Sequence, residues 1–179
     1  MTRPRVYLAG PEVFLPDPQR AAAAKKALCE RHGFTGVFPL DAGLELGGLA
    51  PRDAALAIGR ANEDLIRSCQ HLVANLTPFR GPSADAGTVW ELGFARGLGL
   101  RVHGYSNVAR DFAARTRAFL RDHPDPLAVE SFGLADNLML AHAIEASGGA
   151  FVARSAPRAK RYTDLSAFEE CLVTASRSA

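Results

Sequence analysis

The stretch His71–Gly97, HLVANLTPFRGPSADAGTVWELGFARG, decides the fold. It begins with the apolar run HLVANL at 71–76, which is typical of a strand buried within a sheet. A loop rich in turn-forming residues follows at 77–86, and a helix is predicted from Gly87 or Thr88 to about Leu98. Because RVHGY at 101–105 predicts the next strand, this stretch has the alternation of strand, loop and helix that favours a parallel sheet.

The same alternation runs through the rest of the chain. Strands are predicted at 5–9, at 36–40 and, as a short edge strand or loop, at 148–152; helices are predicted at 18–31, 53–69, within 107–126, at 137–146 and at 163–175. Pro39 restricts its strand to an edge or an end, and Leu56 and Ile58 are assigned to the inward face of the helix at 53–69. We therefore predict an α/β doubly wound parallel sheet with helices on both faces, in a single domain over residues 1–179.

Composition and charge narrow the class of protein. The chain has 179 residues, of which 47% are hydrophobic and 22% charged, as in ordinary globular proteins. Its net charge of +2 comes from 21 basic and 19 acidic residues without long blocks of one sign, so no nucleic-acid partner is expected. Cys29, Cys69 and Cys171 are isolated and are predicted to be buried thiols. With neither a secretory signal nor a membrane span in the sequence, we expect a cytoplasmic protein without a membrane partner.

The segment DAGTVWELG, Asp85–Gly93, is the strongest candidate for a functional motif. Parallel sheets carry their sites at the carboxyl ends of strands, where both this segment and Gly10-Pro11 fall. Gly87 and Thr88 at a strand-to-helix junction let backbone amides and a hydroxyl face a ligand. Two interpretations of Glu91 remain open: it completes a capping box with Thr88, or it is a carboxylate kept among apolar residues for chemistry. Asp85 is either an Asx-turn residue or converges on the same cavity.

Other chemistries find little support in the sequence. The five histidines lack the spacing of a metal site, and no Gly-x-Ser-x-Gly elbow, dinucleotide fingerprint or phosphate loop is present. We therefore expect no metal and no organic cofactor. A carboxylate-driven displacement at an anomeric carbon is the template that fits what remains.

Several segments together resemble the nucleoside 2-deoxyribosyltransferase family. They are the segments at 6–14 (VYLAGPEVF) and 74–81 (ANLTPFRG), the Asp85-x-Gly-Thr-x-x-Glu-x-Gly-x-Ala95 motif, and the segments at 132–134 (FGL) and 137–139 (NLM). The resemblance implies a flavodoxin-like fold and transfer of 2-deoxyribose between nucleobases, an activity of nucleotide salvage. The implied partners are 2′-deoxynucleosides and free nucleobases, and the implied assembly is a homo-oligomer whose sites are shared between subunits.

The resemblance also implies roles for individual residues. Glu91 would be the nucleophile that attacks C1′ of the nucleoside, Tyr7 would hold its carboxylate, and Asp85 would line the nucleoside site. A covalent glycosyl ester followed by transfer to a second base gives net retention. Asn137 and Met139 would come from a neighbouring subunit, and Phe14 and Phe79 can stack on a base. The predicted substrate-binding residues are Gly10, Pro11, Phe14, Asn62, Phe79, Gly87, Thr88, Asn137 and Met139.

One position departs from some members of the family. Asn62 stands where those relatives carry an aspartate beside the leaving base, and an amide can hydrogen-bond a base but cannot protonate it. Asp85 or a water would then supply the proton. Apart from Arg80 and Ser83 the sequence offers no phosphate cradle, which favours nucleosides over nucleotides. Two alternatives stay open: hydrolysis of the same N-glycosidic bond in a deoxynucleoside or deoxynucleotide, and a non-catalytic nucleoside-binding sensor.

Overall fold

Five strands form one parallel sheet in the computed structural model, which describes residues 3–177. The strands are β1 (Arg5–Ala9), β2 (Thr35–Val37), β3 (His71–Asn75), β4 (Arg101–Ser106) and β5 (Phe151–Ala153). Their order across the sheet is β2-β1-β3-β4-β5, and every neighbouring pair is parallel. This is the strand order of flavodoxin-like doubly wound folds, so the predicted fold class is confirmed.

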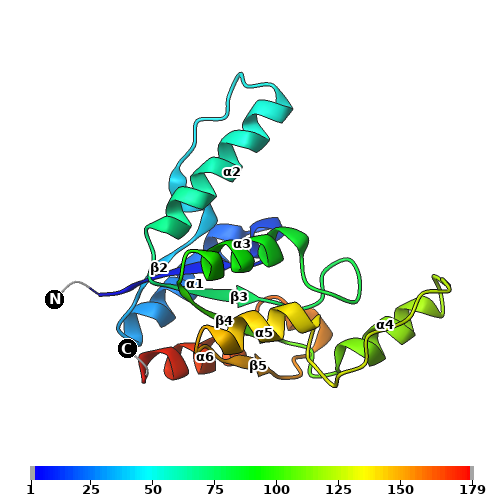
Figure 1. Cartoon of the computed structure of the whole chain (residues 1–179). Coiled ribbons are helices and arrows are strands. Elements are labelled where there is room, and N and C mark those ends of the chain that lie inside the picture. Colours follow the sequence, from blue (N-terminus) through cyan, green and yellow to red (C-terminus); the bar gives the residue numbers. More distant parts are fainter. Residues whose placement is uncertain (1–2, 178–179) are drawn as a thin grey trace.

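Helices cover both faces of the sheet (Figure 1). Buried residues of α1 (Pro18–Arg31) and α6 (Ser166–Ser176) pack against one face. The end of α2 (Pro51–Arg67), together with α3 (Ala86–Gly97) and α5 (Leu138–Ala146), packs against the other. The remaining helices are α4 (Phe112–Leu120) and the short 3-10 helices η1 (Pro11–Phe14), η2 (Pro39–Ala42) and η3 (Arg158–Lys160).

The alternation of side chains along β1 divides the core into two clusters. Val6 and Leu8 belong to the cluster beneath α1 and α6, whereas Tyr7 and Ala9 belong to the cluster beneath α3 and α5. Successive side chains of a strand point to opposite faces of the sheet, so a strand in the middle of the sheet is apolar at nearly every position. One consequence matters for function: the Tyr7 side chain points to the face that α3 covers.

Helix α2 projects beyond the sheet, as Figure 1 shows. Ile66, near its end, is the one fully buried residue of the helix, while Leu56 and Ile58 are 45% and 42% exposed. The prediction that Leu56 and Ile58 face inward is therefore wrong. The helix has an apolar stripe as predicted, but its first two turns extend past the layer that the stripe could pack against.

Several element boundaries also differ from prediction. The second strand ends at Val37 rather than Leu40, because Pro39, which has no N–H to donate to a ladder, begins η2. Helix α3 begins at Ala86, slightly earlier than predicted, and α6 begins at Ser166 rather than Thr163. All three cysteines are buried and unpaired, as predicted. Among residues 3–177 no helix has the length and apolar character needed to cross a bilayer.

Candidate active site

Tyr7 and Glu91 form the centre of the candidate site. The Tyr7 hydroxyl donates a hydrogen bond to Glu91 Oε1 at 2.7 Å, and Asn62 Nδ2 lies 3.4 Å from the same oxygen. Tyr7 comes from the buried strand β1, Asn62 from α2 and Glu91 from α3. The fold thus brings two predicted site residues, Tyr7 and Asn62, onto the carboxylate of a third, Glu91.

The surroundings of Glu91 set its protonation. Burial raises its pKa to about 7; the hydrogen bond from Tyr7 acts in the opposite direction, and the negative charge of Asp85 adds to the rise. The pKa of Tyr7 is raised well above its ordinary value, chiefly by burial and then by the adjacent Glu91, so its hydroxyl stays protonated as a donor at neutral pH. A carboxyl group that titrates near neutrality, held by a fixed donor, is suited to chemistry in which it gains and loses charge.

The first turn of α3 resolves the two interpretations of the motif. Asp85 is the N-cap: its Oδ2 accepts from the Thr88 backbone N–H at 3.0 Å and from Thr88 Oγ1 at 3.1 Å. Glu91 lies well inside the helix and bonds to Tyr7, so the capping-box interpretation of Glu91 is wrong. Thr88 is buried with its hydroxyl directed to Asp85, and Gly87 is exposed in the same turn.

Gly10 and Pro11 follow β1 and lead into η1. A side chain at position 10 would overlap the Glu12 carboxylate and lie 2.9 Å from Asn75 Cβ, so Gly10 allows a close approach within the chain itself. Pro11 is buried at the start of η1. The backbone at the end of β1 is therefore fixed by packing on its inner side.

The two phenylalanines predicted to stack on a base lie next to each other. Phe14, at the end of η1, and Phe79, after β3, have ring centroids 5.4 Å apart and an interplanar angle of 15°. Phe14 is 57% exposed. The rings thus stack on one another and leave outer surface of Phe14 open to a flat ligand.

A buried polar cluster that the sequence did not predict lies near the carboxyl ends of β1, β3 and β4. Lys25 of α1 forms an ion pair with Glu12, and Asn75 and Tyr105 donate to Glu12 Oε1 at 3.0 and 2.9 Å. All four side chains are essentially inaccessible to solvent. In the sequence, Lys25 sits in an alanine- and lysine-rich helix that resembles a solvated surface, so no local signal marked it.

Asn137 and Met139 lie at the start of α5. Asn137 caps the helix by accepting from the Met139 backbone N–H at 3.0 Å, and its Nδ2 donates to Glu130 at 2.8 Å. Met139 is 61% exposed. Within the described chain, these hydrogen bonds join Asn137 to its own loop and helix rather than to Tyr7 or Glu91. Over residues 3–177 no group of three or more His, Cys, Asp or Glu side chains is arranged to hold a metal ion.

Comparison with known proteins places the chain in a family. Residues 6–139 match the nucleoside 2-deoxyribosyltransferase family, and an uncharacterized protein of Schizosaccharomyces pombe is 30% identical over 84% of this chain and 81% of its own length. The 2-desoxiribosyltransferase of Leishmania mexicana is 32% identical, with a TM-score of 0.58 over 76% of this chain and 85% of that chain. The 2-deoxyribosyltransferase of Bacillus psychrosaccharolyticus shares the fold, with 18% identity and a TM-score of 0.53 over 82% and 84% of the two chains. The chain belongs to the nucleoside 2-deoxyribosyltransferase family.

Proposed function

We propose that this protein transfers 2-deoxyribose between nucleobases through a covalent intermediate on Glu91. The observation that carries the proposal is the buried pair of Tyr7 and Glu91, in which a phenol hydroxyl lies 2.7 Å from the carboxylate. A carboxylate used as a nucleophile needs one oxygen oriented and the other available for attack. Glu91 Oε1 receives the hydrogen bonds from Tyr7 and Asn62, which leaves Oε2 as the proposed nucleophilic atom.

In the first step, ionised Glu91 attacks C1′ of a bound 2′-deoxynucleoside from the face opposite the base. The bond between C1′ and the base nitrogen breaks, its electron pair leaves with the base, and the base takes up a proton. The product is a glycosyl ester on Glu91, and the positive charge that develops on the sugar ring is met by the carboxylate itself.

In the second step, a nitrogen of another base attacks C1′ of the ester from the opposite face. The bond between C1′ and Glu91 breaks, the incoming base loses its proton, and the carboxylate is regenerated. Each step inverts C1′, so the product retains the configuration of the substrate. If water attacks instead, the same intermediate gives free deoxyribose, which is the hydrolase alternative.

Asn62 is proposed to contact the leaving base. Its Oδ1 is buried and has no hydrogen-bond partner among the described residues, so a bound ligand that donates an N–H would satisfy it. An amide does not supply a proton, so the proton on the leaving base comes from Asp85 or from water. Asn62 therefore selects and orients the base without acting as its acid.

Base exchange tests the proposed activity directly. The protein is incubated with deoxyinosine and free adenine, and the expected product is deoxyadenosine. Hypoxanthine release without deoxyadenosine would instead establish a hydrolase, and nucleoside binding without turnover would establish a sensor. Glu91→Gln should abolish base release, while Glu145→Gln, at an exposed glutamate of α5, should leave it unchanged.

Trapping tests the covalent step separately. A nucleoside of 2-deoxy-2-fluoroarabinose slows hydrolysis of the glycosyl ester, because fluorine destabilises the oxocarbenium-like transition state. Mass spectrometry of the digested protein should find the sugar on Glu91. An adduct on another residue, or turnover with no adduct, would refute Glu91 as the nucleophile.

We also propose that a second copy of the chain supplies Asn137 and Met139 to the site. Met139 and Phe132 of this segment are exposed, and Asn137 reaches no part of the Tyr7–Glu91 pair through its own hydrogen bonds. Glu91→Gln and Asn137→Ala are each expected to be inactive alone. Mixing the two variants should restore part of the activity, since a mixed oligomer contains sites with both native residues. Activity that stays absent after denaturation and joint refolding would contradict a shared site.

A further inference from the structure

Four arginines line one pocket between the loop after β3 and the start of α4. The pocket has a volume of about 340 Å³, and its lining includes Arg80, Arg110, Arg115 and Arg161. The other lining residues are apolar, glycine or proline, and no carboxylate is among them. None of the lining residues is Tyr7, Asn62, Asp85 or Glu91, so the pocket does not include the Tyr7–Glu91 pair.

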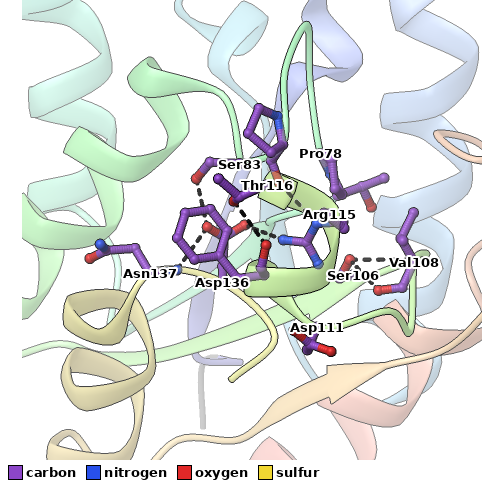
Figure 2. Close-up of polar contacts among 12 residues, drawn as sticks. Pro78, Ser83, Ser106, Val108, Asp111, Arg115, Thr116, Asp136 and Asn137 are labelled. Atoms are coloured by element: carbon purple, nitrogen blue, oxygen red, sulfur yellow. Dashed lines mark hydrogen bonds and ion pairs between the residues drawn. The ribbon is translucent and has the colours of Figure 1, made fainter. Parts of the chain in front are cut away.

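Arg115 forms the rigid part of this pocket. Arg115 is largely buried, and Figure 2 shows its guanidinium directed toward Asp136. Nε donates to the Pro82 carbonyl at 2.8 Å, Nη1 to the Arg110 carbonyl at 2.6 Å, and Nη2 to Asp136 at 3.1 Å. Asp136 in turn accepts from Ser83 at 2.6 Å. The network ties the loop after β3, which carries Arg80, to the loop after β4, which carries Arg110.

The other three arginines leave the pocket with excess positive charge. Within residues 3–177, no carboxylate lies within ion-pair distance of Arg80, Arg110 or Arg161. Asp136 is already paired with Arg115, and Asp111, which caps α4 through the Ala114 N–H, also acts on Arg115 through its charge. Burial lowers the pKa of Arg115, the charges of Asp136 and Asp111 raise it, and the charge of Arg161 lowers it, so Arg161 lies close enough to act on the same guanidinium. Like charges gathered in this way are stabilised when an anion binds between them.

Arg80 links the pocket to the stacked aromatic pair. It is the one non-glycine residue with a positive φ, 55°, in the part of the chain that the structure describes. Its guanidinium lies over the rings of Phe79 and Phe14, at 4.7 and 5.4 Å from their centroids. A left-handed conformation costs free energy at a residue with a side chain, and such strain concentrates at binding sites. This backbone conformation holds the Arg80 side chain at the wall of the pocket, and the same loop carries Phe79.

We propose that this arginine pocket binds the phosphate groups of a polyphosphate-bearing ligand, such as a nucleoside di- or triphosphate. Guanidinium groups present paired N–H donors that match phosphate oxygens, and several of them around one cavity favour more than one phosphate. The volume of about 340 Å³ accommodates a short polyphosphate chain. Binding at this pocket does not depend on the activity proposed for Glu91.

Phosphate groups could reach this pocket from two sources. If they belong to the substrate, inorganic pyrophosphate competes with deoxyadenosine 5′-diphosphate in base release but not with deoxyadenosine. If they belong to a separate effector, pyrophosphate binds without competing with either substrate. In both outcomes the pocket is the binding site. The outcomes distinguish binding of the substrate's own phosphates from binding of a separate effector.

Calorimetric titration of the full chain with inorganic pyrophosphate tests the site. Arg110→Ala and Arg161→Ala are each expected to weaken binding roughly tenfold or more, because each removes a charge-assisted contact. Arg117→Ala is the control, since Arg117, on α4, donates to Ser131 and does not line the pocket. Binding should also weaken as salt increases. Absence of saturable binding to the folded wild type, or equal weakening by Arg117→Ala, would overturn the proposal.

Discussion

The Tyr7 hydroxyl lies 2.7 Å from Oε1 of Glu91, although 84 positions separate the two residues in the chain. The contact exists because β1 lies in the middle of the sheet and turns Tyr7 toward the face that α3 covers. It places a neutral donor against a carboxyl group that burial would otherwise keep protonated to higher pH. The sheet therefore tunes the charge of Glu91.

Removal of the Tyr7 hydroxyl should shift the pH dependence of base release. The hydrogen bond favours ionised Glu91, so Tyr7→Phe raises the pKa of Glu91 above about 7 and moves the acidic limb of the kcat profile to higher pH. At pH 7 the rate should fall roughly tenfold or more. Tyr162→Phe is the control, because that hydroxyl bonds to the Pro78 carbonyl, and its profile should match wild type. An acidic limb that stays in place in Tyr7→Phe would show that Glu91 ionisation does not limit the rate.

Asp85 should affect Glu91 and the stability of α3 by separable routes. Asp85→Asn keeps an oxygen that accepts from the Thr88 N–H, so the free energy of unfolding should change little. It removes a negative charge, which lowers the pKa of Glu91 and moves the acidic limb to lower pH. Asp85→Ala should shift the limb likewise and also cost about 1 kcal/mol of stability. Urea unfolding and a pH profile of both variants distinguish the effects; an unstable Asp85→Asn protein would contradict the cap assignment.

The buried pair of Lys25 and Glu12 should be required for stability. Lys25→Met leaves the Glu12 carboxylate buried without its ion-pair partner, which is expected to cost roughly 3–5 kcal/mol in free energy of unfolding. Lys26→Met, at the adjacent position, breaks a half-exposed pair with Asp41 and should cost at most about 1 kcal/mol. Adding Glu12→Gln to Lys25→Met should recover part of the loss. Equal losses in free energy of unfolding for Lys25→Met and Lys26→Met would show that the buried ion pair stabilises the fold no more than the exposed one.

Elements whose pattern is set by local burial were predictable from the sequence. The apolar runs at 5–9, 71–76 and 101–105 each became a strand of the parallel sheet, and the motif at Asp85 fell on a helix N-terminus. The contact between Tyr7 and Glu91 was predicted from the family resemblance alone, because neither segment by itself indicates that the two residues lie close together.

Features that depend on the spatial relation of distant elements were not predictable. Leu56 and Ile58 form an apolar stripe at helical spacing, but the stripe does not show where the sheet ends. Lys25 is buried because Glu12, Asn75 and Tyr105 gather opposite it from three other segments. The arginine pocket likewise combines loops that follow β3 and β4 with the segment before α6.

Two buried histidines should make the fold sensitive to acid. His103 on β4 and His71 on β3 have ring centroids 6.1 Å apart, and burial lowers the pKa of His103 to about 4 and that of His71 below its ordinary value. Below pH 6.5 these histidines therefore take up protons in the unfolded chain but not in the folded chain. Their contribution to the free energy of unfolding is fully present above this pH and is lost as the pH falls toward 4. For His103 the loss amounts to roughly 3 kcal/mol.

A substitution at His103 separates this effect from general acid denaturation. His103→Asn keeps an acceptor for the Ala150 N–H but removes the titrating ring, so the free energy of unfolding should depend less steeply on pH between 6.5 and 4. His142→Asn, at an exposed position of α5, should keep the wild-type slope. Urea unfolding at a series of pH values measures both slopes. The same slope in His103→Asn and wild type would mean that the carboxyl groups, rather than this histidine pair, govern acid unfolding.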